Sequence, residues 1–458
     1  MTRMLDANYL VIGAGAAGMA FVDSLIDNAD VSVVLIDQRH APGGHWLDAY
    51  PFVRLHQASP FYGVVSIPLG SGEVQTEGPE AGLHQRATAP EIVEYYARVL
   101  DRMLASGKVT FYPNSKYLGD RQFSSLNSGE RFAVSERCRI VDARYLAPDI
   151  PALTPAPFDV ADGVRVVPIN DLPAMSDEPR QFVIVGAGKT ATDAIVWLLG
   201  NGVDPGAICW VRPREPWMFN RAAVQPDPVI YASMVAGVFE AARDAASPDD
   251  LFLRMEESGL MLRIDRAVTP TMAKTPTLAQ WELDRLRMVD KVVRQGHVRR
   301  VEPGRVICAR GETTIDRGAV VVHCAASGLQ YPPTIPIWGN DAITLQSVGT
   351  GPTFGAAVAG YLEATRDDDA EKNRLCPPQP FMNTPADWPR FIVWGARASA
   401  AMMTQPDIKQ WANGTSLYRS RVPADRANDP DVVSALARTR TAVEAGLPRL
   451  AQLGGMAD

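Results

Sequence analysis

Two stretches of the chain share one pattern of apolar and polar positions. An apolar run at 9–12 precedes a glycine-rich turn at 13–18, and a similar run at 182–185 precedes a turn at 186–191. Continuous apolar runs of this length are typical of parallel strands covered on both faces. Helical apolar spacing follows each turn, so the pattern predicts two strand–turn–helix units about 170 residues apart.

The first turn has glycines at the three positions of the dinucleotide-binding fingerprint. Gly13 makes the tight turn, Gly15 lets a pyrophosphate approach the backbone, and Gly18 lets the helix pack closely on the strand. Ala16 and Ala17 open the helix, whose free N–H groups attract phosphate. All five residues are candidate cofactor ligands; an unrelated glycine turn in another α/β unit is the alternative.

An acidic residue closes the next predicted strand. The apolar run 31–36 ends in Asp37, about 20 residues beyond the first turn, where a carboxylate accepts the ribose hydroxyls of a dinucleotide. Gln38 follows it, and both residues are candidates for cofactor binding.

The second turn also matches the fingerprint, with one change. Its candidate cofactor-binding residues are Gly186, Gly188, Lys189, Thr190 and Ala191, where the alanine takes the place of the third glycine. Lys189 suggests a nucleoside-triphosphate loop, but the leading glycine that such a loop requires is absent.

The strand after the second turn ends in arginines. Arg212 and Arg214 follow the run 207–211, where an NAD-binding chain places an acid. Guanidinium groups match the oxygens of a 2′-phosphate, so we expect NADPH rather than NADH. The alternative is that both arginines are solvated charges at the end of a strand.

The segment 41–59 narrows the choice of the first cofactor. It contains Gly43-Gly44, then Trp46, then Tyr50-Pro51. In these residues and in its two glycine turns, the chain resembles the class B flavoprotein monooxygenases, which comprise Baeyer–Villiger, flavin-containing and N-hydroxylating enzymes. The resemblance implies that the first unit binds FAD, that Gly43, Gly44 and Trp46 lie along it, and that 54–59 passes the isoalloxazine.

The same resemblance gives the catalytic candidates. His56 stands where the relatives have an Asp or Asn that holds the nicotinamide or the peroxyflavin. A histidine can donate a hydrogen bond or relay a proton because its ordinary pKa lies near neutrality. Gln57 and Arg54 are the next candidates. Alternatively, His56 only hydrogen-bonds the flavin edge or a backbone carbonyl.

A later glycine-rich segment, 347–355, precedes an alanine-rich helical run. In FAD domains of this topology a late helix directs its N-terminus at the flavin pyrimidine, where its dipole stabilises negative charge on the reduced ring. Gly351 and Thr353 are therefore further candidate cofactor-binding residues.

These features predict an α/β fold with two Rossmann-like dinucleotide-binding domains, one for FAD and one for NADP, the second inserted into the first. We expect residues 1–160 and 325–458 to form the FAD domain and 164–324 the NADP domain. Residues 215–296 do not follow the βαβ pattern and predict a helical insertion that caps the active site, or else a dimer interface. Leading into it, Trp217, Phe219, Asn220 and Arg221 are candidates to line the cleft, or else are packing residues. Arg263, Arg266 and Lys274 would tolerate a carboxylate.

Composition excludes several functions. The 458 residues carry a net charge of -7, which gives no electrostatic reason to bind nucleic acid. The five cysteines form no C-x-x-C pair and the six histidines no metal-ligand spacing, so no metal site or dithiol is expected. No apolar run approaches 18 residues, and a first strand near Asn8 leaves no room for a signal peptide, which predicts a cytoplasmic protein without membrane contact.

The function implied is an NADPH- and O2-dependent flavin monooxygenase acting on a small molecule through a C4a-(hydro)peroxyflavin, with a homodimer possible. N-oxygenation, S-oxygenation, hydroxylation and Baeyer–Villiger insertion all fit. The relatives' fingerprint before the second turn is missing from 162–172, so ketone-to-ester chemistry is not specifically expected. The alternatives are a flavin reductase that passes electrons to a quinone or another acceptor, and a non-catalytic flavin-holding partner, although the latter would predict a damaged loop.

Overall fold

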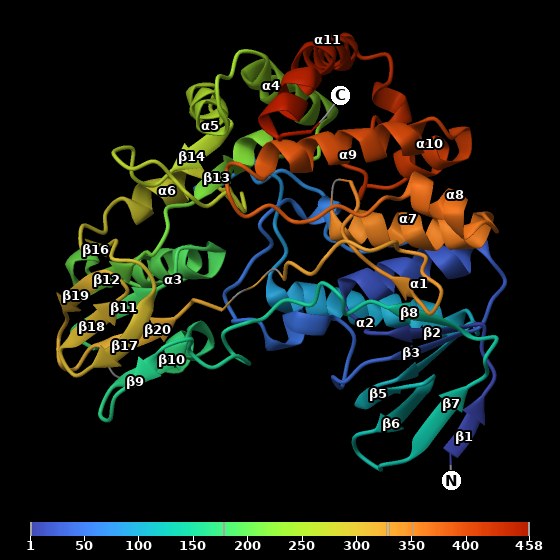
Figure 1. Ribbon diagram of the computed structural model, residues 1–458, viewed down its shortest axis with the longest axis horizontal. Coiled ribbons are helices and arrows are strands. Elements are labelled where there is room, and N and C mark those ends of the chain that lie inside the picture. Colours follow the sequence, from blue (N-terminus) through green and yellow to red (C-terminus); the bar gives the residue numbers. More distant parts are fainter. Residues whose placement is uncertain (1, 177–178, 327, 329, 350, 457–458) are drawn as a thin grey trace.

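Two five-stranded parallel sheets, set apart from each other, organise the molecule (Figure 1). The structure, a computed structural model, describes residues 2–176, 179–326, 328, 330–349 and 351–456. The first sheet has the order β21 (Ile343–Thr344), β8 (Arg139–Asp142), β2 (Tyr9–Ile12), β3 (Val33–Ile36), β4 (Val109–Tyr112). The second has the order β10 (Arg165–Pro168), β20 (Val320–His323), β11 (Phe182–Val185), β12 (Ile208–Val211), β16 (Val292–Val293). The predicted α/β fold with two Rossmann-like units is confirmed.

Three helices cover the first sheet: α1 (Ala16–Asn28), α2 (Ala89–Ala105) and α7 (Pro352–Thr365). Helices α1 and α7 lie in very close contact, since a Cβ added to Gly360 would lie 2.3 Å from the Phe21 carbonyl oxygen. Strand β21 and helix α7 come late in the chain, so the chain returns to the first sheet after it has built the second.

A smaller sheet beside the first begins with an unpredicted strand. Its order is β1 (Thr2–Leu5), β7 (Arg131–Val134), β6 (Gln122–Ser125), β5 (Ser115–Gly119). The expected first strand near Asn8 is therefore the second, β2. Strand β1 is mostly exposed and has no apolar run, so the hydrophobic pattern did not indicate it.

The second sheet carries helix α3 (Lys189–Gly200), which begins at the second glycine turn. A four-stranded sheet packs beside it, in the order β19 (Gly311–Thr314), β18 (Arg305–Cys308), β17 (Val298–Glu302), β9 (Asp159–Val160).

The segment 215–296 contains helices α4 (Pro228–Arg243), α5 (Pro248–Glu257) and α6 (Gln280–Leu286). It also contains a three-stranded sheet of β14 (Met261–Arg263), β13 (Trp217–Asn220) and β15 (Thr277–Leu278). A purely helical description of this segment is therefore incomplete. Strands of two to four residues are too short to show the alternation that predicts a strand.

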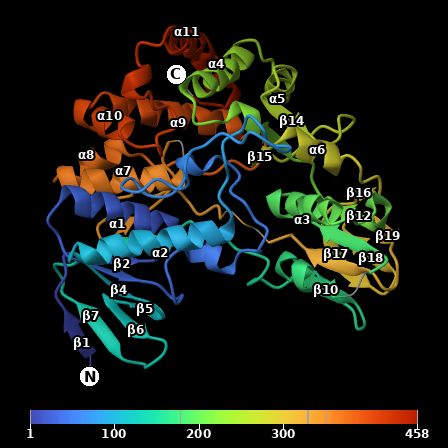
Figure 2. The same ribbon diagram turned by 180° about the vertical axis from the view of Figure 1, so that it is seen from behind.

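The last part of the chain forms α8 (Asp369–Leu375), α9 (Trp388–Met403), α10 (Pro406–Asn413) and α11 (Pro430–Leu453). Helix α11 lies along α4, and a Cβ on Gly446 would lie 2.1 Å from the Phe239 carbonyl oxygen. The inserted segment and the C-terminal helices together span the molecule above both sheets, as Figure 2 shows from behind. Among the described residues, no helix is both long and apolar enough to cross a bilayer.

Candidate functional site

The first glycine turn has the geometry that its sequence predicts. Gly13 has a φ of 107°, and a Cβ on Gly18 would lie 1.9 Å from the Gly13 carbonyl oxygen. Helix α1 has no side-chain cap at its N-terminus and no acidic residue in its first turn. Its first N–H groups and positive dipole end are thus available to an anion, which fits a dinucleotide pyrophosphate.

Asp37 braces this turn from the end of β3. One carboxylate oxygen accepts a hydrogen bond from the Ala14 N–H at 2.7 Å, and the other accepts from the Arg39 N–H at 2.8 Å. Each carboxylate oxygen keeps a second lone pair, so the buried Asp37 can still accept a ribose hydroxyl. Gln38 is exposed next to it.

The Gly43-Gly44 pair lies directly against the first turn. The Gly43 N–H donates to the Ala14 carbonyl oxygen at 2.9 Å, and a Cβ on Gly44 would lie 3.0 Å from the Gly15 Cα. Buried Trp46 donates its indole N–H to the Tyr62 hydroxyl at 2.7 Å. The structure therefore places the glycine pair against the first turn, with Trp46 in the short 3-10 helix that follows.

The second glycine turn is more open than the first. Gly186 has a φ of 139°, and a Cβ there would lie 2.7 Å from the Cys324 carbonyl oxygen. A Cβ on Gly188 would meet nothing within 4 Å, and helix α3 begins there without a side-chain cap. This open space before free N–H groups fits a second pyrophosphate. Ala191 is fully buried on the helix, and Thr190 is partly exposed.

Lys189 connects the second turn to the first unit. Its ammonium group pairs with Asp193 one turn later, and the other Asp193 oxygen accepts from the Tyr50 hydroxyl at 2.6 Å. Next to this contact, the Phe52 and Trp197 rings stack at 4.9 Å. The segment that follows Trp46 is therefore docked on helix α3.

The structure separates the two predicted arginines. The Arg212 side chain is buried over the Trp210 ring, and its Nε lies 2.9 Å from a Glu215 oxygen. Burial lowers the pKa of Arg212 to about 10, against the opposing effect of Glu215. Arg214 donates to the Asn383 side-chain oxygen at 3.1 Å and forms no ion pair within the described part of the chain.

Lys274 lies beside Arg214. Its Nζ is 5.0 Å from the centre of the Tyr331 ring, and its pKa is lowered by burial and by the nearby Arg214 charge. A second cation beside an ammonium group makes the place favourable for an anion. The other two basic candidates differ: Arg263 pairs with Glu256 at 2.8 Å, and Arg266 is exposed.

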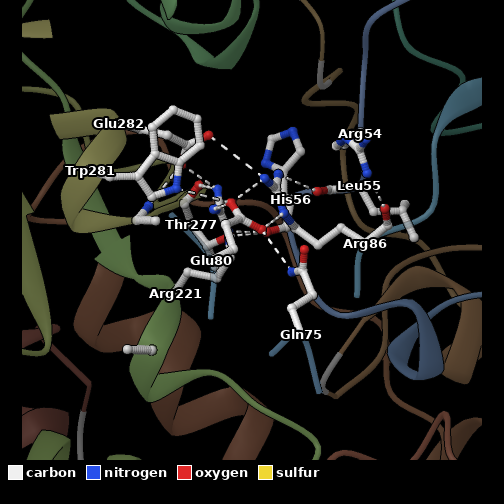
Figure 3. Close-up of polar contacts among 12 residues, drawn as sticks. Arg54, Leu55, His56, Gln75, Glu80, Arg86, Arg221, Thr277, Trp281 and Glu282 are labelled. Atoms are coloured by element: carbon white, nitrogen blue, oxygen red, sulfur yellow. Dashed lines mark hydrogen bonds and ion pairs between the residues drawn. The ribbon is translucent and has the colours of Figure 1, made fainter. Parts of the chain in front are cut away.

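His56 lies where the first unit meets the inserted segment (Figure 3), and the charge of Lys189 from the second glycine turn also acts on it. Its carbonyl oxygen accepts from the Arg221 Nε at 3.1 Å and from the Thr277 hydroxyl. The preceding carbonyl, that of Leu55, accepts from Arg86 at 3.1 Å. Two arginines therefore fix the backbone on which the His56 side chain stands.

A buried cluster of charges supplies these contacts. Arg221 lies 2.7 Å from Glu80 and 2.6 Å from Glu282, and Arg86 pairs with Glu80 at 2.5 Å. Burial by itself would raise the pKa of Glu80 and Glu282, but the arginines outweigh it and both pKa values are lowered. The four charges balance, so the cluster can stay ionised in the interior.

The pKa of His56 is lowered well below its ordinary value, first by burial and then by Lys189, Arg221 and Arg86. The imidazole is consequently neutral at physiological pH, unlike the near-neutral titration on which a proton relay would depend. No described residue forms a hydrogen bond with its ring or with the Gln57 side chain. Both side chains are therefore available to a ligand.

Arg54 differs from its neighbours. Its side chain is exposed and donates to the Arg86 carbonyl oxygen at 3.3 Å. Figure 3 shows it directed away from the cluster around His56. The structure therefore does not bring Arg54 together with the other two catalytic candidates.

Gly351 caps helix α7, whose N-terminus has no side-chain cap and no acidic residue in its first turn. Thr353 is buried in that turn. The linker before the second turn also contacts the first unit, since the Asn170 amide donates to the Asp48 carbonyl oxygen at 3.0 Å.

Known proteins match this chain at two levels. A profile of the NAD(P)-binding Rossmann-like domain matches residues 11–52. The uncharacterized protein Rv2000 of Mycobacterium tuberculosis is 40% identical over 420 residues, which are 91% of this chain and 78% of that protein; the uncharacterized protein Mb2023 of Mycobacterium bovis gives the same values. The chain belongs to the family of these mycobacterial proteins.

Two solved structures are similar to this chain. An oxidised steroid monooxygenase bound to NADP has a TM-score of 0.50 and 15% identity, and the match covers 96% of this chain and 97% of that one. A closed cyclohexanone monooxygenase has a TM-score of 0.49 and 14% identity over 98% of both chains. The steroid monooxygenase confirms, for the fold, the resemblance to class B flavoprotein monooxygenases.

The charged cluster is what sequence reasoning did not identify. Arg221 was only a candidate for lining the cleft, and Glu80, Arg86 and Glu282 carried no signal at all. They lie in separate segments without a motif, so only the folded chain brings them together.

Proposed function

We propose that the protein is an NADPH- and O2-dependent flavoprotein monooxygenase that acts on a small molecule. The observation that carries the proposal is the junction at His56. There the segment beside the first glycine turn meets Lys189 of the second turn and Arg221 of the inserted segment. A junction of two dinucleotide-type turns under a covering segment suits electron transfer between two cofactors near an enclosed substrate.

FAD fits the first turn and NADPH the second. When bound, FAD supplies hydride acceptance from NADPH and the reduction of O2. Gly15 and the start of α1 would hold the FAD pyrophosphate, and Gly188 and the start of α3 that of NADPH. Arg214 and Lys274 would bind the 2′-phosphate, since Arg212 is already committed to Glu215.

His56 would act as a neutral residue. Its imidazole would donate one ring N–H toward the bound nicotinamide or substrate, while Arg221 and Thr277 keep its backbone in place. A neutral imidazole offers both a donor and an acceptor, so it can orient a ligand without changing charge. The buried surroundings would exclude water from the reaction.

Rapid-mixing absorbance tests the proposal. The yellow holoprotein is reduced anaerobically with NADPH and then mixed with oxygenated buffer in the presence of NADP⁺. We expect a transient absorbance that precedes the return of the oxidised flavin spectrum. Direct return without a transient, with fast reduction of a quinone, would instead identify a flavin reductase.

A further inference from the structure

Arg419, which follows α10, carries a partly buried positive charge that no carboxylate of the described residues neutralises. No aspartate or glutamate among the described residues forms an ion pair with it. The pKa of Arg419 is lowered by burial, and the only opposing influence is the Tyr231 hydroxyl. Three more deeply buried arginines are different, because Arg86, Arg212 and Arg221 each pair with a glutamate.

An unpaired charge in such a place costs folding free energy, since burial removes the water that stabilises it. Sites of this kind are commonly completed by a ligand of opposite charge. The groups that surround Arg419 therefore indicate which ligand it could bind.

Three segments converge on the guanidinium group. Its Cζ lies 5.6 Å from the centre of the Phe61 ring. Phe61 follows shortly after the 54–59 run, which is expected to pass the isoalloxazine. A Cβ on Gly351, at the start of α7, would lie 3.1 Å from an Arg419 terminal nitrogen. Tyr231 comes from α4 of the inserted segment, and its ring packs edge-on against Phe61 at 6.0 Å.

We propose that Arg419 binds a carboxylate of the substrate, beside the aromatic rings of Phe61 and Tyr231. The inference rests on the proposed function, because it takes the junction of these three segments as the place where substrate binds. The planar guanidinium offers two parallel N–H groups to a carboxylate, and the two largely buried rings beside it make its surroundings apolar. The substrate class is then a small organic acid with an apolar body.

Binding of matched acids and amides tests the proposal on the oxidised holoprotein, without NADPH or turnover. Benzoate is compared with benzamide and hexanoate with hexanamide, by calorimetry and by perturbation of the flavin spectrum. We expect the wild type to bind each acid at least about 10-fold more tightly than its amide, as a charge-assisted hydrogen bond provides. Arg419→Gln should remove this preference and Arg419→Lys should retain part of it.

Arg426→Gln is the matched control, because Arg426 lies nearby in sequence but pairs with Asp227 and Asp429 at the surface. It should keep the full preference for acids. Equal affinity of acid and amide in the wild type, for both pairs, would overturn the proposal. So would a preference that survives Arg419→Gln while the flavin midpoint potential shifts, since Arg419 would then serve the flavin rather than the substrate.

The binding test and the oxygen-reaction test fail independently. A preference for acids without a transient in the oxygen reaction would support the carboxylate site and reject the monooxygenase. A transient without that preference would do the reverse.

Discussion

The two glycine turns share a motif but differ in how tightly the protein surrounds them. The first is enclosed: Gly18 touches the Gly13 carbonyl, Gly44 lies on Gly15, and Asp37 binds the Ala14 N–H. The second is open: Gly188 faces free space, and an alanine, Ala191, replaces the third glycine.

This difference suits two cofactors that bind in different ways. A cofactor that stays bound through turnover gains from a preorganised, enclosed site, because little ordering remains to be done on binding. A cofactor that exchanges in every cycle needs an open approach. The enclosed turn therefore suits resident FAD, and the open turn suits NADPH.

The largest expected effect comes from filling the enclosed turn. In Gly18→Val the new side chain would collide with the Gly13 backbone, and we expect a loss of roughly 3 kcal/mol or more in stability together with loss of bound flavin. Flavin absorbance per protein and the melting temperature measure this. Gly188→Ala is the control: it should keep its flavin and only weaken NADPH binding. Equal flavin loss in both variants would remove the distinction between the turns.

The second largest effect is expected from breaking the charged cluster at the junction. Arg221→Met leaves Glu282 buried without its close arginine and Glu80 with Arg86 alone, which should lower the free energy of unfolding by about 3–5 kcal/mol. Denaturant titration measures the change. In Arg438→Met the lost pair with Glu240 is exposed, so a change of at most about 1 kcal/mol is expected. Similar losses in the two variants would show that the junction is not a special point of the fold.

The open turn can be tested through its nucleotide preference. Arg214→Gln should raise the KM for NADPH by roughly 10- to 100-fold, because one charge-assisted contact to the 2′-phosphate is lost. The KM for NADH should not change, since NADH lacks that phosphate. Steady-state kinetics with both nucleotides decides this, and a parallel rise for NADH would assign Arg214 a structural role.

The smallest expected effect is on how the free energy of unfolding depends on pH. The folded pKa of His45 is lowered to about 4, mainly by burial and also by Arg39, and that of His56 is also lowered. Above about pH 6.5 these histidines are neutral in both folded and unfolded chains and contribute nothing; below it the unfolded chain takes up protons that the folded chain resists, so stability falls. Unfolding free energies from pH 7 to 4 should fall less steeply in His56→Gln than in the wild type. Identical slopes would mean that His56 is not held neutral.

Local signals predicted much of this molecule. The glycine turns, the acid after β3 and the helices behind both turns follow from residues within about 25 positions of one another, because strand, turn and helix formation are local. The short strands β1, β13 and β15 escaped prediction, since so few residues carry no periodicity and their pairing depends on distant partners.

The sequence by itself therefore determined the two dinucleotide-type units and the residues of their turns. Only the tertiary structure decided that Arg212 is neutralised by Glu215 while Arg214 is not, and that Arg221 holds the His56 carbonyl. It also decided that Arg419 has no carboxylate partner within the part of the chain that the structure describes. The physical reason is that pairing, burial and pKa depend on which side chains meet in space, and contacts such as that of His56 with Arg221 join residues 165 positions apart along the chain.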